Sequence, residues 1–526
     1  MTEFFISAKH KVIGVPATPA IKNLFPEAKE LQYNGHTLSV IPHDAAGVHL
    51  LKQMGYKVGA PILTHYEWTG VHKPFIVQKL TCALLTMNTR AYVLNDLGTG
   101  KTASALWAFD YLKKMGHVNK ALIIAPLSTL NFVWGREILA ITPHLKYQIL
   151  HHSNRHKRLE RLNDMEADIY IINHDGASLL HDNLLARKDI DLIIIDELSV
   201  YRNHGTTRSK KLRELAKSRL GVWGMTGKPI PRAPTDVFGQ AKIITPDRVP
   251  QYFRSIQQDM MIKVSQFQWV PKDGAIERAF NILQPSVRFE LSDVTELPPC
   301  VERMQQVDLG PKQKKIYETM VKKCYIMMGN DEIKAVHASA LMTKLVQISC
   351  GWVYNSQGTA VELDHGTRTT ALIDIINDGQ NKIIVYVPFK HALSGISKLL
   401  ASNDIDHCVA SGDTPPNQRA QLFNLFQNTT KYKVMVAHPR CIAHGLTLTA
   451  ADTTIWFCPT HDLDIYDQAN GRIRRVGQKN KQQIIKLFST PVERKIYRSL
   501  DEKTTMQVSL LDLLKQATSD SIGNLT

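Results

Sequence analysis

Short apolar runs alternate with longer amphipathic stretches in two separate parts of the chain. In the first part the apolar runs occupy residues 91–94, 121–125, 168–172, 192–195 and 221–225. Runs that are apolar at nearly every position, rather than at alternate positions, are typical of parallel strands buried on both faces. The helix-length segments between them supply the covering layers, so this part predicts an α/β domain with a parallel sheet.

The same rhythm returns further along the chain, which predicts a second parallel sheet. Its runs occupy residues 382–387, 407–410, 433–437, 454–458 and 483–487. The intervening residues 227–380 are richer in helical patterns, and residues 1–60 carry prolines at short intervals. We therefore expect a small N-terminal accessory domain (1–60), a first lobe with a short protrusion (61–290), a helical linker or protrusion of the second lobe (291–380), the second lobe (381–490) and a helical tail (491–526).

The net charge is strongly positive, with 64 Lys and Arg against 48 Asp and Glu, a formal charge of +16. Such an excess favours a polyanionic partner, most simply nucleic acid, although many basic proteins only carry a solvated positive face. Seven scattered cysteines, without a Cys-x-x-Cys pair, argue against a disulfide framework and a structural zinc site. The absence of a signal-like start and of long apolar runs leads us to expect a soluble intracellular protein.

A phosphate-binding loop follows the first strand, where residues 95–102 read Asn-Asp-Leu-Gly-Thr-Gly-Lys-Thr. The glycines let successive backbone N–H groups point at an anion, and the start of the following helix adds its positive end. We expect Lys101 to reach the β- and γ-phosphates as a catalytic cation and Thr102 to bind Mg²⁺. The nucleotide-binding residues predicted here are Leu97, Gly98, Thr99, Gly100, Lys101 and Thr102.

The loop departs from the pattern G-x-x-x-x-G-K-[ST] at its first position, which is Asn95. A glycine-rich turn without a ligand is the alternative interpretation. The Lys-Thr ending and the position between a strand and a helix favour the phosphate loop.

A second motif, which is acidic, narrows the range of possible reactions. The apolar strand after Asp191 ends in Asp196 and Glu197. The carboxyl end of a parallel sheet is the edge where open α/β sheets bind ligands. We expect Asp196 to hold Mg²⁺ and Glu197 to polarise the water that attacks the γ-phosphate. Two acids at a strand end are common, so this assignment depends on the phosphate loop upstream.

These motifs resemble those of the helicase superfamily 2 ATPases, and within them the Snf-type (switch/sucrose-non-fermenting) DNA translocases. The resemblance extends from about Pro74 to Leu487. It implies an α/β fold of two tandem RecA-like lobes with helical insertions, and an enzyme that uses ATP and Mg²⁺. The compact length suggests a bacterial or phage-encoded member of the family.

Other segments of the first lobe carry the same resemblance. Gln78 stands where the family reads the adenine base, and residues 125–130 with Trp134 and Glu137 resemble a motif that contacts the DNA backbone. Residues 226–229 read Thr-Gly-Lys-Pro, where relatives have a Thr-Gly-Thr-Pro turn that couples the nucleotide state to lobe movement.

In the second lobe, residues 468–478 and 444–449 match two further family motifs. The resemblance implies nucleotide contacts for Gln468 and Gly445, and catalytic roles for Arg472 and Arg475. The two arginines lie three apart on a predicted helix, so both guanidinium groups point the same way. They could then supply charge to the γ-phosphate in the manner of an arginine finger.

The resemblance implies an ATP-driven motor that translocates on double-stranded DNA and remodels DNA or protein–DNA structures. A strand-separating DNA or RNA helicase is one alternative, and a nucleic-acid-binding scaffold whose ATPase has decayed is another. We expect a monomer in the cytoplasm of a bacterial or phage-infected cell, with backbone contacts to DNA, no membrane, and a protein partner for the N-terminal domain. Two basic runs, at residues 155–158 and 208–219, fit DNA contacts and a solvated face equally well.

Overall fold

We describe the protein from a computed structural model. The structure describes residues 4–33, 35–265, 269–296, 298–329, 335–354, 360–363, 365–442, 447–475 and 477–501, together with positions 510, 512, 514, 515 and 518. The chain divides into two compact units, Met1–Val294 with Met506–Thr526, and Thr295–Thr505. In the part of the chain that the structure describes, no helix combines the length and the apolar character that crossing a membrane requires.

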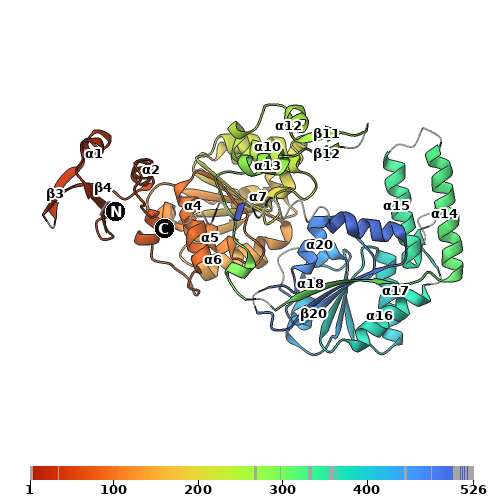
Figure 1. The fold of residues 1–526 in the computed structure, drawn as a ribbon. Helices are drawn as coiled ribbons and strands as arrows, with labels where there is room; N and C mark the ends of the chain where they lie inside the picture. Colours follow the sequence, from red (N-terminus) through yellow and green to blue (C-terminus); the bar gives the residue numbers. More distant parts are fainter. Residues whose placement is uncertain are drawn as a thin grey trace. The chain divides into compact units, whose positions relative to one another are not determined.

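The first unit is built on a seven-stranded sheet in which all neighbouring strands run parallel (Figure 1). Its order is β13 (Ser286–Val287), β5 (Arg90–Val93), β10 (Gly221–Met225), β9 (Ile190–Asp196), β6 (Lys120–Ala125), β8 (Ile169–Asn173) and β7 (Tyr147–Ile149). All five apolar runs predicted for this sheet are strands. The predicted fold class is confirmed, but β7 and β13 were not predicted, because two or three residues are too short to form an apolar run.

Helices cover both faces of this sheet, which explains why its central strands are apolar throughout. One face packs on α4 (Ile76–Met87), α5 (Lys101–Lys114) and α6 (Arg136–Ile141). The other face packs on α7 (Arg155–Leu162), α8 (His174–Leu179), α9 (His181–Ala186), α10 (Thr207–Lys217) and α11 (Val237–Ile244), and its core extends to α12 (Phe253–Met260) and α13 (Ala275–Ile282). A hairpin of β11 (Met261–Lys263) and β12 (Trp269–Pro271) follows α12.

The N-terminal residues form a four-stranded antiparallel sheet in the order β1 (Phe5–Ser7), β2 (Val12–Pro16), β4 (His36–Pro42) and β3 (Lys29–Tyr33). Two helices accompany it, α1 (Pro19–Leu24) and α2 (Ala45–Gln53), and Asp44 caps α2 by accepting a hydrogen bond from the Gly47 N–H at 2.8 Å. Ile13 and Ile41 belong to the same apolar core as Leu80 of α4. The short helix α3 (Pro61–His65) connects this sheet to the rest of the unit.

Positions near the end of the chain also pack on the first unit. Leu510 and Leu514 are buried in the core of its second face. Thr518 Oγ1 accepts a hydrogen bond from the backbone N–H of Arg288 at 2.9 Å. Lys515 pairs with Glu290 at 2.6 Å.

The second unit is built on a six-stranded sheet whose neighbouring strands are again parallel. Its order is β14 (Cys300–Gln306), β21 (Gln482–Phe488), β20 (Ala451–Trp456), β17 (Lys382–Tyr386), β19 (Val434–Ala437) and β18 (His407–Ala410). The five predicted runs all fall on strands, although β20 begins three residues earlier than expected. The edge strand β14 was not predicted because most of its side chains are polar and exposed.

Helices α15 (Ala335–Cys350), α16 (Gly366–Asp378) and α17 (Lys390–Ser402) pack on one face of the second sheet. Helices α18 (Pro416–Asn428), α19 (Pro439–Ile442) and α20 (Leu463–Asn470) pack on the other. Helix α14 (Pro311–Gly329) runs beside α15 (Figure 1), and the strands β15 (Trp352–Tyr354) and β16 (Ala360–Glu362) form a small hairpin.

A buried ion pair ties α16 to the segment after β21. Arg368 and Glu493 are 2% and 0% exposed, and two parallel hydrogen bonds of 2.8 Å join the guanidinium to the carboxylate. Burial opposes the charge of Arg368, but the attraction and hydrogen bonds of Glu493, together with nearby Cys350 and Cys458, outweigh it, so the pKa of Arg368 is raised. We predict that Glu493→Gln destabilises the second unit by about 3–5 kcal/mol, because an uncompensated buried charge remains.

Hydrogen exchange of peptides from β17 and β20 measures this loss within the second unit. The matched control is Glu362→Gln, which removes an exposed carboxylate that pairs with His365 and should cost less than about 1 kcal/mol. Equal protection in both variants would contradict the assigned role of the buried pair.

Candidate active site

Three adjacent strands of the first unit bring the predicted motifs to one edge of the sheet. β5, β10 and β9 are neighbours, and Met225 is in register with both Val93 and Asp196. The segments that follow these strands are the loop 95–102, the turn 226–229 and Glu197. The carboxyl ends of parallel strands are the usual ligand-binding edge of an open α/β sheet, so the motifs meet where the chemistry needs them.

The loop 95–102 has the backbone of a phosphate cradle. Gly98 and Gly100 have φ values of +89° and +80°, a region that glycine enters without strain. A Cβ on Gly100 would lie 2.0 Å from Nε2 of Gln78, so the amide of Gln78 would have to move to admit a side chain there. Helix α5 begins directly at Lys101, and Thr102 lies half-buried in its first turn. This arrangement fits a bound triphosphate.

Asn95 explains why the loop departs from the expected glycine. Its side chain is buried, its Nδ2 donates to Oγ1 of Thr81 at 3.0 Å, and its Oδ1 accepts from the backbone N–H of Phe289 at 3.0 Å. Asn95 therefore joins the start of the loop to α4 and to the segment after β13. Glycine could not make either bond.

Asp96 and Arg288 form a second brace, which the sequence did not predict. Arg288 pairs with Asp96 at 2.7 Å and donates to the carbonyl oxygen of Leu94 at 2.8 Å. Arg288 is buried and stands 194 residues from Leu94. No local pattern around position 288 indicates this role, since it arises only when β13 pairs with β5.

Lys101 is half-buried among carboxylates and carbonyl groups. Its Nζ donates to the backbone oxygens of Asn95 at 2.8 Å and Asp96 at 2.9 Å. Burial lowers the pKa of Lys101, while the charges of Glu197, Asp196 and Asp96 oppose that shift. A desolvated lysine with its charge held by acids suits the binding of phosphate oxygens.

Asp196 ends β9 with both carboxylate oxygens engaged. Oδ1 accepts from the backbone N–H of Glu197 and Oδ2 from the indole Nε1 of Trp134, both at 3.1 Å. Burial raises the pKa of Asp196, and the Trp134 bond and the Lys101 charge oppose this. Glu197 has a φ of +55°, which is uncommon for a residue with a side chain and typically costs about 1–3 kcal/mol. Such strain beside a phosphate loop is typical of a catalytic residue.

Trp134 has a different environment from the one that the resemblance implied. Its side chain is fully buried, so it does not present its ring to a nucleic acid. A π-helical turn, η2 (Leu130–Gly135), directs the indole inward to Asp196, whereas Leu127 and Phe132 beside it are 53% and 42% exposed. Single π-helical turns are frequent at functional sites. We correct the expectation accordingly: Trp134 supports the acidic motif.

Gln78 and the turn 226–229 both lie against the phosphate loop. The Oε1 of Gln78 accepts from the backbone N–H of Phe75 at 2.9 Å, and its Nε2 faces Gly100. Thr226 Oγ1 accepts from the Lys228 N–H at 3.2 Å, and a Cβ on Gly227 would lie 3.3 Å from the carbonyl oxygen of Asn95. The adenine contact of Gln78 stays a prediction.

In the second unit, Arg472 and Arg475 are not on a helix, contrary to our expectation. Helix α20 ends at Asn470, and successive turns follow it. Two backbone hydrogen bonds of 3.0 Å hold these turns: the Leu448 N–H donates to the carbonyl oxygen of Arg472, and the Gln478 N–H donates to the carbonyl oxygen of Arg475. Burial lowers the pKa of Arg475 to about 10, so it remains cationic at neutral pH.

The side chains of both arginines are held within this unit. Arg472 is buried and its Nε donates to the backbone oxygen of Gln468 at 2.9 Å, while Arg475 donates to Oγ1 of Thr447 at 3.2 Å. Oε1 of Gln468 is buried and has no hydrogen-bond partner among the described residues. The predicted nucleotide contact at Gly445 lies outside the described residues.

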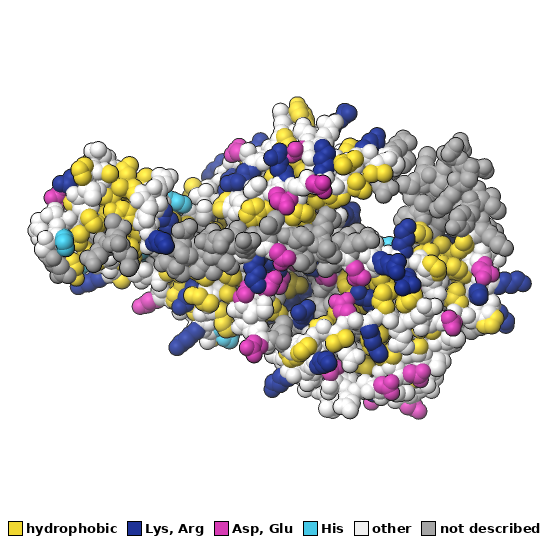
Figure 2. All heavy atoms as spheres, viewed as in Figure 1, with side chains coloured by type: hydrophobic (Ala, Val, Ile, Leu, Met, Phe, Trp, Pro, Cys, Tyr) yellow, Lys and Arg dark blue, Asp and Glu magenta, His cyan; other side chains and the backbone are white. Residues whose placement is uncertain are grey.

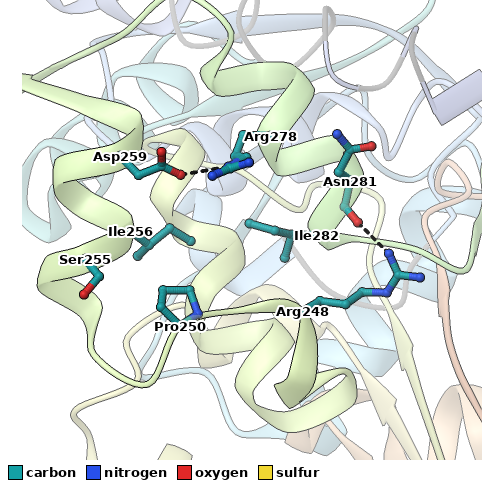
Figure 3. Close-up of a pocket in the computed structure, with 8 residues that line it drawn as sticks. All are labelled: Arg248, Pro250, Ser255, Ile256, Asp259, Arg278, Asn281 and Ile282. Atoms are coloured by element: carbon teal, nitrogen blue, oxygen red, sulfur yellow. Dashed lines mark hydrogen bonds and ion pairs between the residues drawn. The ribbon is translucent and has the colours of Figure 1, made fainter.

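A separate cavity of about 500 Å³ lies over α12 and α13 of the first unit (Figure 3). Ile256 and Ile282 lie at its centre, and Arg278 at its rim pairs with Asp259 at 2.8 Å. None of its lining residues belongs to the loop 95–102 or to the acidic motif. It is therefore not part of the candidate active site.

Mg²⁺ is compatible with the donors at the phosphate loop. Within the described ranges no group of three or more His, Cys, Asp or Glu side chains is placed to hold a metal. Mg²⁺ needs no such cage, because it is usually held by one or two protein oxygens, waters and substrate phosphates. The Asp196 carboxylate at the strand end and the Thr102 hydroxyl in the first turn of α5 are donors of that kind.

Comparison with known families identifies the chain. Residues 81–350, more than half of it, match the SNF2-related domain, and residues 367–477 match the helicase conserved C-terminal domain. The chain belongs to the SNF2-related family. It is thus an ATP-dependent, helicase-like motor protein, as the sequence motifs indicated.

Individual relatives are distant. Protein p41 of Acyrthosiphon pisum secondary endosymbiont phage 1 is 26% identical over 416 residues, which cover 75% of this chain and 86% of p41. An uncharacterized ATP-dependent helicase of Mycoplasma pneumoniae is 24% identical, over 78% of this chain and 39% of its own length. The SWI2/SNF2 ATPase core of Sulfolobus solfataricus in complex with dsDNA is 20% identical, over 88% of this chain and 98% of that one, with a TM-score of 0.40. This SNF2-related chain thus spans most of the phage relative but only about two fifths of the mycoplasma protein.

The bond from Trp134 to Asp196 generates a testable prediction. Trp134→Phe keeps the buried ring but removes the N–H donor, so Asp196 loses its orientation. Removing such an outer partner of a metal ligand typically weakens metal affinity about 10–100-fold. We expect an increase of that order in the Mg²⁺ concentration needed for half-maximal binding of a fluorescent ATP analogue.

The control is Trp223→Phe, which removes another buried indole donor in the same sheet. Its Nε1 donates to the carbonyl oxygen of Asn88 at 3.2 Å, near the amino end of β5 and away from the carboxyl ends that carry the site. This variant should match the wild type in Mg²⁺ dependence. An unchanged Mg²⁺ requirement in Trp134→Phe would remove Trp134 from the site.

Proposed function

We propose that the protein hydrolyses ATP to translocate along double-stranded DNA and to remodel DNA or protein–DNA structures. The observation that carries the proposal is the convergence of the phosphate loop, Asp196 and Glu197 at one sheet edge, in a chain that also has the helicase C-terminal domain. The charge of +16 supports a polyanionic track. Two similar proteins, a Xenopus laevis SWI/SNF-related regulator of chromatin and a Bos taurus DNA annealing helicase, bear names that refer to chromatin or DNA.

In this proposal, the triphosphate occupies the cradle of residues 97–102, and Lys101 binds the β- and γ-phosphate oxygens. The Thr102 hydroxyl and the Asp196 carboxylate would hold Mg²⁺, which would supply positive charge to the phosphate oxygens when bound. Glu197 orients the attacking water and accepts its proton. Gln78, beside Gly100, reads the adenine through its amide.

We assign the remaining cationic charge to the second unit. Arg472 and Arg475 stabilise the charge that spreads over the transferred phosphoryl group, and Gln468 and Gly445 contribute further nucleotide contacts. Repeated closing and reopening of the two lobes around ATP then moves one lobe along the DNA relative to the other. Grip on phosphates rather than bases makes this movement independent of DNA sequence.

The ATPase rate with different nucleic acids tests this function. We predict that duplex DNA stimulates phosphate release more than single-stranded DNA or RNA does, and that Lys101→Ala abolishes release with every cofactor. Forked DNA should stimulate no more than duplex DNA of equal length. Stimulation by RNA alone would favour a strand-separating RNA helicase, and no stimulation at low salt would favour a scaffold with a decayed ATPase.

A charge-matched pair of variants tests the arginine assignment. Arg475→Gln should lower the rate of hydrolysis by about 10³-fold or more, the usual effect of losing an arginine finger, while ATP-analogue affinity changes little. Arg474→Gln removes the same charge from an exposed neighbour and should leave the rate within about threefold. Equal rates in the two variants would refute a catalytic role for Arg475.

A further inference from the structure

The basic run at residues 208–219 divides into two faces with different partners. Arg208 pairs with Asp175 at 2.7 Å, and Lys211 donates to the carbonyl oxygen of Ser178 at 2.9 Å. Arg219 is buried and donates to the carbonyl oxygens of Leu184 and Ile190. These three cations fasten α10 and its end to α8, α9 and β9, so their role is structural.

The other three cations of the run lie on one flank of α10. At 100° per residue, Lys210, Arg213 and Lys217 fall within an arc of about 60°. Helix α11 packs beside α10 and contributes Lys242. We call these four residues the α10–α11 basic face. Within the part of the chain that the structure describes, none of the four forms an ion pair with an acid.

The side chains next to the α10–α11 basic face show that its positive charges lie close together. The Nζ of Lys242 lies 5.5 Å from the ring centroid of Phe238, and His204 is stacked on Phe253 at 5.0 Å. Burial lowers the pKa of His204, and the nearby charges of Arg213, Lys210 and Lys242 lower it further. The negative charge of Asp247 acts in the opposite direction on Lys242 and raises its pKa.

This accumulation of charge does not help the chain to fold. Residues 210 and 213 are spaced i,i+3, and 213 and 217 i,i+4, so their like charges repel along the helix. Glu214, spaced i,i+4 from Lys210 and i,i+3 from Lys217, offsets part of this repulsion. Lys242 is in addition partly desolvated, which lowers its pKa and disfavours its charged form. An anion that binds across all four residues would relieve both costs.

The shape of the basic face favours a long polyanion over a small ligand. Lys210 to Lys217 span about 10 Å along the helix axis, and duplex DNA carries one charge per roughly 1.7 Å. None of the four residues lines the cavity over α12 and α13. Figure 2 shows Lys and Arg side chains in the region of α10, α12 and α13, with acidic side chains among them. Lys210 and Lys217 are exposed and Arg213 and Lys242 are half-buried, so a phosphate backbone can contact such a row of cations.

The chain direction carries the far end of this face away from the ATP site. Helix α10 returns the chain from the carboxyl end of β9 to the amino end of β10. Lys217, in its last turn, therefore lies toward the opposite end of the sheet from the phosphate loop.

We propose that the α10–α11 basic face is an accessory surface that binds the phosphate backbone of duplex DNA. The inference rests on the proposed function, which supplies the duplex. The face adds affinity without reading bases and without touching the reacting atoms. It assigns to Lys210, Arg213, Lys217 and Lys242 a contact that the family motifs do not include.

The test compares two triple variants with the same change in charge. Lys210→Gln/Arg213→Gln/Lys217→Gln neutralises the helix flank, and Lys398→Gln/Lys481→Gln/Lys495→Gln neutralises three exposed lysines of the second unit. Binding of a fluorescent duplex is measured from low to moderate salt. Loss of three phosphate contacts should lessen the slope of log K against log salt by about 2.7 and weaken binding at least roughly tenfold at low salt. The control should keep the wild-type slope.

Further readouts separate this proposal from folding effects and from the proposed function. ATPase activity without DNA and the thermal unfolding temperature should match the wild type, and Lys242→Gln alone should lessen the slope by about 0.9. If wild type binds duplex and is stimulated by it, but the helix variant keeps the same slope, the accessory surface is refuted and the proposed function stands. If wild type neither binds duplex nor responds to it, both proposals fail. Loss of oligoglutamate binding with unchanged duplex binding would instead reveal an acidic-protein surface.

Discussion

The parallel pairing of β5, β10 and β9 is the constraint on which the rest of this structure depends. Parallel strands must all end at the same edge, so loops from distant parts of the sequence are brought together there. The loop 95–102, the turn 226–229 and Glu197 share that edge only because their strands are neighbours in register. The helices that bury both faces of the sheet make the edge rigid, and rigidity is what a preorganised site requires.

Burial of opposite charges at this edge gives the site its chemical character. Lys101 is desolvated and faces Asp96, Asp196 and Glu197, so each charge makes burial of the others tolerable. Residues around these four charged side chains hold them in place. Asn95 and Arg288 anchor the loop, and Trp134 orients Asp196. The N-terminal sheet shares an apolar core with α4, the helix against which Asn95 is anchored. The proposed ATP-binding edge of this SNF2-related motor is thus held in place by contacts from several distant segments.

Local patterns predicted much of the fold and the inner part of the site, because they have local physical causes. The apolar runs of the central strands, the glycines with positive φ and the acids at the end of β9 are each visible in a few adjacent residues. Asp96–Arg288 and Trp134–Asp196 were not predictable, because each joins segments that meet only in the folded sheet. Arg472 and Arg475 were misplaced on a helix because the turns after Asn470 depend on bonds from Leu448 and Gln478. The basic run 208–219 stayed ambiguous in the sequence until its partners on α8 and α9 separated the two faces of α10.

Displacement of the third strand from a DNA triplex tests the central claim most directly, since it reports movement along an intact duplex. The account predicts that the protein with ATP releases the third strand without separating the duplex beneath it, and that Lys101→Ala releases none. Release without ATP, no release despite duplex-stimulated hydrolysis, or separation of the duplex strands would contradict a translocase built on this ATP-binding edge.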